Sequence, residues 1–114
     1  MVLREGDKIH VIARRGFEQD LRRHFAGEVV AVSDYICKAV GHVFVLNPST
    51  NRFSRKPEKR TRIVSLIDAG NIINILPSNV NTDDLNYVSG AQGHMTVTDG
   101  ASFTLDIQEF LSNV

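Results

Sequence analysis

The chain has 114 residues and no net charge, and 42% of its residues are apolar and 23% charged. This length fits one domain, and the composition is that of a folded globular protein, which excludes wholesale disorder. The apolar runs are too short to span a bilayer, and no apolar signal segment follows Met1. We therefore expect a single cytoplasmic domain without a membrane partner, with a core over residues 25–77 and an extension over 78–114.

The zero net charge conceals an uneven distribution along the chain. All thirteen Lys and Arg residues lie in Met1–Arg62, which also holds seven acids, whereas Ile63–Val114 holds six acids and no Lys or Arg. The two parts therefore carry formal charges of +6 and −6. Such a split indicates either a dipolar surface or basic and acidic faces that meet between subunits, and compositional drift along a short chain is the alternative.

The apolar pattern predicts strands through most of the chain. Alternation predicts a first strand over Lys8–Ala13. Phe17, Leu21 and Phe25 recur every fourth residue, which favours a short helix over Phe17–His24. Four apolar, β-branched stretches follow, separated by polar or glycine-containing connections: Gly27–Ser33, Ala39–Leu46, Thr61–Ile67 and Asn71–Leu76.

Two of these stretches carry further information. Gly27–Ser33 is apolar on both faces, as expected for a strand that is covered on both sides. Gly41 interrupts the next strand, which begins near Ile36, and predicts a bulge or sharp bend of the kind that curls a small sheet. Turns are predicted at Ser33–Tyr35, Asn47–Asn51 and Asp68–Asn71.

The tail predicts a hairpin. Ser78–Asp84 is a polar connection, and His94–Thr98 has the pattern of a strand. Asp99-Gly100 is a strong hairpin dipeptide, and the alternation over Ser102–Ile107 provides the partner strand. The last residues, Gln108–Val114, form either a short helix or a frayed end.

Two sequence patterns follow each other in the central part of the chain. Gly27–Asp34 is a glycine followed by alternating apolar residues and an aspartate at a predicted turn. Ile63–Pro77 is an apolar stretch, a turn with glycine and Asn, and a short isoleucine-rich stretch. In this order the two patterns resemble the first and second motifs of the Sm/LSm family of RNA-associated ring proteins, and the resemblance covers roughly half of the chain.

This resemblance implies a small Sm-like or SH3-like barrel, assembly into a homo-oligomer and binding of single-stranded RNA at the motif turns. Gly70 and Asn71 match the second-motif turn, and Tyr35 follows the first-motif Asp34. Two features depart from the family pattern: no Asn shortly follows Asp34, and Ala69 stands where Arg is common. The family's usual inner-pore contacts with RNA are therefore not all present.

The segment Arg52–Arg62 is the best ligand-binding candidate by residue type. It holds six basic residues and one acid, and Pro57 indicates a loop or edge that becomes a regular strand near Arg60. Clustered Lys and Arg residues attract phosphates, and an aromatic ring can stack on a base. The candidate nucleic-acid-binding residues are Tyr35, Arg52, Phe53, Arg55, Lys56, Lys59, Gly70 and Asn71.

Each of these candidates has a structural alternative. The basic segment can be a solvated loop whose charges keep an edge strand from pairing with neighbours. Tyr35 can be a half-buried ring that caps the barrel. Asn71 can serve only the backbone of a tight turn.

The sequence contains no catalytic or metal-binding pattern. Lys38 beside Cys37 could lower the pKa of the thiol, but a buried structural cysteine is the simpler interpretation. The four histidines form no closely spaced ligand pair, and no phosphate-binding glycine loop with a following Lys is present. We expect no enzymatic activity, no cofactor and no metal.

The sequence thus predicts a mainly all-β protein, a small Sm-like or SH3-like barrel with an added N-terminal strand and C-terminal hairpin. The leading function is an oligomeric binding module for single-stranded RNA. A protein-interaction or assembly module is the second hypothesis, and a small enzyme that uses Cys37 or an Asp is the third.

Overall fold

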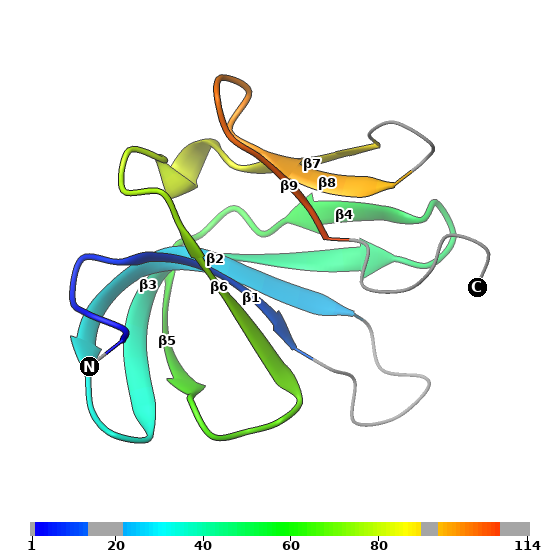
Figure 1. Ribbon diagram of the computed structural model, residues 1–114. Helices are drawn as coiled ribbons and strands as arrows, with labels where there is room; N and C mark the ends of the chain where they lie inside the picture. Colours follow the sequence, from blue (N-terminus) through cyan, green and yellow to red (C-terminus); the bar gives the residue numbers. More distant parts are fainter. Residues whose placement is uncertain (1, 14–21, 90–93, 108–114) are drawn as a thin grey trace. The chain divides into compact units, whose positions relative to one another are not determined.

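The computed structural model describes residues 2–13, 22–89 and 94–107, and over these ranges the protein is all-β, as predicted (Figure 1). The one helical element there is a single 3-10 turn, η1 (Thr82–Asp84). Thus no helix in the described part is long and apolar enough to cross a membrane. The chain divides into two compact units, Met1–Asp83 and Asp84–Val114, here called the first and second units.

Six antiparallel strands form the sheet of the first unit: β1 (Lys8–Ala13), β2 (Arg23–Val32), β3 (Ile36–Asn47), β4 (Arg52–Arg55), β5 (Arg60–Ser65) and β6 (Asn71–Leu76). Their order is β4-β3-β2-β1-β6, and β5 also pairs with β3. No pairing among the described residues joins β5 to β6, so the sheet is not closed into a barrel.

The N-terminal strand is not an addition to this sheet. β1 lies between β2 and β6, with Lys8 opposite both Glu28 and Leu76. It therefore occupies an inner position, which the placement of the core over residues 25–77 did not anticipate. A strand with two neighbours satisfies its backbone hydrogen-bonding groups on both sides. The apolar side chains of Ile9 and Val11 on β1 are buried in the core, which favours this inner position.

β3 pairs along one edge with two strands in succession. Its C-terminal part pairs with β4, and its N-terminal part, Ile36–Gly41, pairs with β5. Between them the Lys56 amide donates to the carbonyl of Val43 at 2.8 Å. β4, the bend at Pro57 and β5 therefore follow one edge of the sheet, so the predicted edge location of the basic segment is confirmed.

Gly41 is required for a close approach of two strands and not for a bulge. It lies opposite Gly27, and a Cβ atom on Gly41 would lie 1.9 Å from the carbonyl oxygen of Ala26. The irregularity in the register of this strand pair falls instead between Val29 and Ala31. Of the two predicted alternatives at Gly41, the bulge is therefore wrong and the sharp bend stays a prediction; the glycine is needed for packing.

One other local prediction needs correction, and one falls outside the described residues. Residues 14–21 lie outside the described residues, but Arg23 and His24, expected near a helix end, are the first residues of β2. Pairing of Phe25 with Val11 and Val43 overrides the weak helical spacing. The possible C-terminal helix over Gln108–Val114 also lies outside the described residues.

One face of the first unit's sheet carries the apolar core. Alternate residues of β1, β2 and β3 supply most of it, with Val64 from β5 and Leu3 from the N-terminal segment. On β2 the residues Glu28, Val30 and Ala31 are exposed. The expected covering of this strand on both faces is therefore wrong along its C-terminal half.

The second unit contains a three-stranded antiparallel sheet of β7 (Asn86–Ser89), β8 (Met95–Thr98) and β9 (Thr104–Asp106). The predicted hairpin is confirmed as β8 and β9, whereas β7 was not predicted. At its turn the Asp99 carboxylate accepts hydrogen bonds from the amides of Ala101 and Phe103 at 2.9 and 3.1 Å. These bonds lower the pKa of Asp99. Gly100 adopts a φ of 78°, which favours glycine.

Candidate nucleic-acid interface

The basic segment occupies one edge of the first unit's sheet, here called the basic edge: β4, the connection at residues 56–59 and the first residues of β5. Three of its cations already have a hydrogen-bond or ion-pair partner within the first unit. Arg55 donates to the backbone carbonyl of Asp83, Lys59 lies 3.0 Å from the Asp83 carboxylate, and Arg60 pairs with Glu58. The hydrogen bond from Arg60 is the main cause of a lowered pKa of Glu58.

The other three cations of this segment are Arg52, Lys56 and Arg62. All three are exposed, and none forms an ion pair with a residue that the structure describes. Such cations remain available for phosphates, whereas Arg55 and Lys59 would first have to leave Asp83. The candidate residues of the basic edge are therefore not equivalent.

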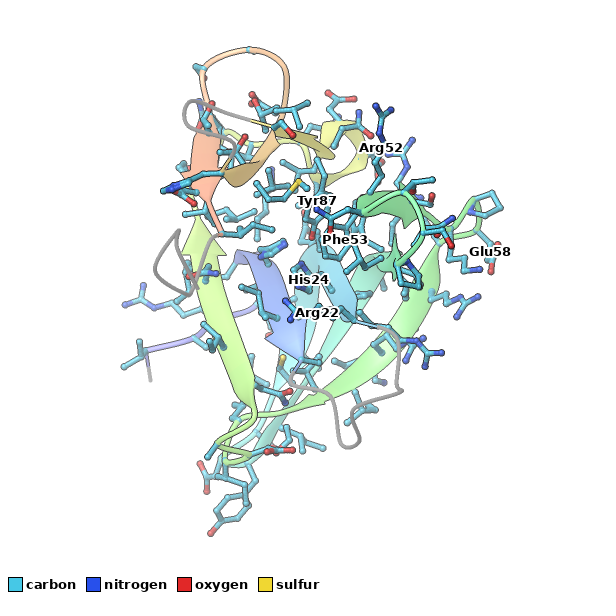
Figure 2. The ribbon with its side chains drawn as sticks, turned by 90° about the vertical axis from the view of Figure 1, so that its right-hand side faces the viewer. Arg22, His24, Arg52, Phe53, Glu58 and Tyr87 are labelled. Atoms are coloured by element: carbon cyan, nitrogen blue, oxygen red, sulfur yellow. The ribbon has the colours of Figure 1, made fainter. Side chains whose placement is uncertain are left out.

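Phe53 is only partly exposed because its ring packs on His24. The two ring centroids are 4.5 Å apart with an interplanar angle of 33°, and Figure 2 shows the two side chains next to each other. One face of the Phe53 ring is therefore occupied by a neighbour within the first unit. This contact favours a structural role for Phe53 over stacking on a base.

Tyr35, Gly70 and Asn71 lie together at the other end of β3. The Leu66 amide donates to the carbonyl of Tyr35 at 2.7 Å, and the Asn71 side-chain amide donates to the carbonyl of Ser65 at 3.2 Å. The β2–β3 and β5–β6 turns thus lie side by side, at the lower end of Figure 1.

The predicted site residues therefore form two groups and not one site. The turn group is next to the start of β3, whereas the basic edge runs along β3 from Arg52, opposite Asn47, to Arg62, opposite Ala39. Because a strand rises roughly 3.3 Å per residue, the contour along β3 from the turn group is about 36 Å to Arg52 and about 10 Å to Arg62. Tyr35 is 64% exposed and is the one aromatic side chain of the candidate set that is open to solvent.

Three histidines are buried on the first unit's sheet. His10 contacts His24 edge to face, with centroids 5.3 Å apart. Burial lowers the pKa of His10 to about 4; burial, His10 and Arg22 lower that of His24 to about 3. His42 lies 3.7 Å from the Asp83 carboxylate, and burial is the main cause of its lowered pKa. Both His10 and His24 are therefore neutral at pH 7.

No metal site is formed by these histidines. Among the residues that the structure describes, no three His, Cys, Asp or Glu side chains gather in a way that could hold a metal ion. In the second unit, His94 Nδ1 lies 2.9 Å from the Asp106 carboxylate. A His–Asp pair alone does not define a reaction.

Cys37 does not have the environment of a reactive thiol. It is 1% exposed and belongs to the core of the first unit. Burial raises the pKa of its thiol. Because the thiolate is the nucleophile, both properties argue against the hypothesis that Cys37 performs catalysis.

A hollow of about 340 Å³ opens on the core face of the first unit. Its apolar lining includes Val11, Phe25 and Val43, and its polar lining includes Arg23 and Arg62. Sequence reasoning placed Arg62 in the basic segment Arg52–Arg62 but named neither arginine among the individual candidate residues. The signal was the strand alternation itself, because each arginine lies two residues before an apolar core residue of its own strand.

Comparisons of this chain with protein-family models, with curated proteins and with solved structures found no match.

Proposed function

We propose that this protein is a non-enzymatic module that binds single-stranded RNA along the basic edge. The observation that carries this proposal is the exposure of Arg52 and Lys56 without an ion pair in the described part of the chain. Cations on an exposed edge strand attract phosphates and release counterions when they bind them. The edge offers an extended backbone a continuous path along β4 and β5, with a bend at Pro57.

The turn group extends the same interface. β5 continues the edge from Arg60 to Ser65, and Ser65 lies opposite Ile36, the residue after Tyr35. The exposed Tyr35 ring provides a surface on which a base can stack, which is the usual way in which single-stranded RNA is held without a duplex. An RNA strand that runs from Arg52 to Tyr35 would contact the cations first and the aromatic ring last.

The fold that we propose for the first unit is a divergent Sm-like or SH3-like barrel. Two features support it: the last strand of the meander returns to pair with the first, and the two turns that carry the motifs are adjacent. A sheet whose ends approach in this way is curled toward closure. The proposed RNA-binding mode differs from the family's inner-pore mode, because this chain has Ala69 where Arg is common and lacks an Asn shortly after Asp34.

The experiment is a titration of a fluorescently labelled single-stranded RNA with the whole chain, followed by anisotropy at several salt concentrations. We expect Arg52→Gln combined with Lys56→Gln to weaken binding and to reduce the slope of log K against log salt by about 1.4, because two phosphate contacts are lost. Arg4→Gln, an exposed cation away from the edge, is the matched control and keeps the slope. Absence of binding at low salt would refute the proposal.

Tyr35 gives an independent test of the turn group. Tyr35→Ala should reduce RNA affinity by about 1–3 kcal/mol, the usual contribution of one base–aromatic contact. Tyr35→Phe retains the ring and should bind as the original chain does. Equal affinity of the Ala and Phe variants would remove Tyr35 from the interface and leave the basic edge as the whole site.

The second candidate function is assembly of several copies into an oligomer. β5 and β6 each have one edge that pairs with no described strand, and they expose Ile63, Ile72 and Ile75 at 59%, 40% and 50%. Exposed apolar edge strands favour pairing with another chain. The opposite net charges of the two units also favour assembly. The first unit has thirteen basic and nine acidic residues, or +4, and the second has four acidic residues, or −4, so unlike charges on different copies attract each other.

Light scattering coupled to gel filtration tests this second function. We expect a mass above that of one chain, and Ile63→Lys should reduce it by placing a charge on the free edge of β5. A monomer at the working concentration would contradict assembly but would leave the RNA titration unaffected. Both functions are therefore separately testable.

A further inference from the structure

We propose that the hollow on the core face of the first unit binds a small organic anion, with an apolar body on its floor and an anionic head beside Arg23 and Arg62. Arg62 and Ser65 of β5 lie both on the proposed RNA path and at this hollow, whereas Arg23 and the apolar floor lie outside the RNA contacts proposed at Arg52, Lys56 and Tyr35. The inference therefore goes beyond the proposed function.

The positions of the two arginines follow from strand alternation. Arg23 lies two residues before Phe25, and Arg62 lies two residues before Val64, and both apolar residues belong to the core. In a strand, residues two apart lie on the same face. Both guanidinium groups therefore come from the core face of the sheet, although charged side chains are normally placed on the opposite face.

The charge of the hollow is positive and lacks a counterion among the described residues. No acidic side chain of those residues lines it, and neither Arg23 nor Arg62 forms an ion pair with any residue in the described ranges. His24 also lines the hollow but is neutral at pH 7 because its pKa is about 3. Two like charges at one hollow repel each other, and an anion between them relieves this repulsion.

The remaining polar groups suit an anionic head. The Ser65 hydroxyl oxygen accepts from the amides of Ile67 and Asp68 at 3.3 and 3.1 Å, so its own proton is available for donation. The Asn71 amide donates to the Ser65 carbonyl and holds the rim of the hollow in place. Arginine forks bind carboxylate and phosphate through two parallel hydrogen bonds.

The size and floor of the hollow suit an apolar body. Val11, Phe25, Val43 and Val64 supply aliphatic and aromatic contacts, and the volume of about 340 Å³ lies within the range of small-molecule sites. An inorganic ion would contact only the arginines, and an uncharged hydrocarbon would contact only the apolar floor. The ligand class is therefore an amphiphilic anion with a carboxylate or phosphate head.

The test uses a set of probes that differ in one feature each. Hexanoate and hexyl phosphate carry both parts, acetate lacks the apolar body, 1-hexanol lacks the charge and hexylammonium reverses it. Each is titrated into the isotopically labelled full chain, and backbone amide shifts are followed by NMR. We expect saturable shifts at Arg23, Arg62 and Asn71 with hexanoate or hexyl phosphate, and affinities lower by about fivefold or more for the other three probes.

Variants test whether the guanidinium groups of Arg23 and Arg62 bind the anionic head. Arg62→Gln and Arg23→Gln should each lower the affinity for the anionic probes by about three- to tenfold. Arg52→Gln makes the same charge change outside the hollow and should leave the affinity unchanged. If Arg62→Gln fails to fold, Arg62→Lys retains the charge without the fork and should weaken binding to a smaller extent.

Three outcomes would overturn the proposal. The first is an absence of saturable shifts with any probe, which would mean that the hollow takes no small anion. The second is equal binding of 1-hexanol and hexanoate, and the third is equal binding by the Arg62→Gln and Arg52→Gln variants. A preference for hexyl phosphate over hexanoate would support the proposal and identify phosphate as the head group. RNA titrations with the Arg52 and Lys56 variants are independent of all these results.

Discussion

Acidification should destabilise the protein because two buried histidines cannot accept a proton in the folded state. His10 has a folded pKa of about 4 and His24 of about 3, whereas an unfolded histidine titrates near 6.5. Well above pH 6.5 both states are neutral and neither histidine contributes to the pH dependence. As the pH falls below 6.5, the unfolded chain binds protons that the folded chain excludes, so the free energy of unfolding falls.

The magnitude follows from the two pKa values. For each histidine, proton uptake by the unfolded chain alone between pH 7 and pH 5 lowers the free energy of unfolding by about 2 kcal/mol. The two together give at most about 4 kcal/mol, because any proton that the folded chain takes up over this interval reduces the difference between the two states. This is a large fraction of the stability of an ordinary domain.

Urea unfolding followed by circular dichroism at pH 7, 6 and 5 measures this loss. We expect the midpoint to move to lower urea at each step, and His10→Gln to remove about half of the change. His24→Gln is the second variant if the first does not fold. Thr61→Ala, an exposed substitution on β5, should keep the full pH dependence.

Direct titration of the rings by NMR completes the test. The imidazole signals of His10 and His24 should not move between pH 7 and pH 5 in the folded protein. Signals that titrate near pH 6.5, or a free energy of unfolding that changes by less than about 1 kcal/mol over this interval, would refute the reasoning.

Further predictions concern packing and reactivity. Gly41→Ala should destabilise the fold by about 2 kcal/mol or more, measured by urea unfolding, because the new methyl group would collide with the backbone at Ala26; a change as small as that of Thr61→Ala would contradict the close approach. Cys37 should react with a thiol reagent roughly 100-fold more slowly in the native protein than in denaturant, because it is buried and its pKa is raised; equal rates would show that the core opens freely. Phe44→Ala should cost about 3–5 kcal/mol by the same unfolding assay, because the Phe44 side chain is 1% exposed; a loss below about 1 kcal/mol would mean that the site collapses around the cavity.

Most strand positions in the first unit could be predicted from the sequence because their apolar pattern is strong, but β4 was expected only as a loop or edge and the first residues of β2 were expected in a helix. Several strands begin or end close to the expected residues, for example β3 at Ile36, β5 at Arg60 and β6 at Leu76. The pairing of β1 with β6 could not be predicted, since alternation says which residues form a strand and not which strand lies next to it. β7 was missed because the short polar stretch Asn86–Ser89 contains little apolar alternation.

The candidate site was predictable in its residue types and not in its geometry. Clustering in sequence placed Arg52 and Lys59 in one group, but the ion pair of Lys59 with Asp83 depends on a contact between distant parts of the chain. Phe53 was chosen for its ring, and only the fold shows that His24 covers one face of that ring. The grouping of Arg23 with Arg62 likewise required the sheet order.

The inner position of β1 has a consequence for how the chain folds. β2 can pair with β1 and β3 early, because these contacts span short loops, but the second neighbour of β1 is formed by the last strand of the first unit. Until Leu76 has left the ribosome, one edge of β1 presents unpaired backbone groups and the core residues Ile9 and Val11 are incompletely covered. Non-local pairing of this kind slows folding, and during that interval an exposed strand edge favours pairing with other chains.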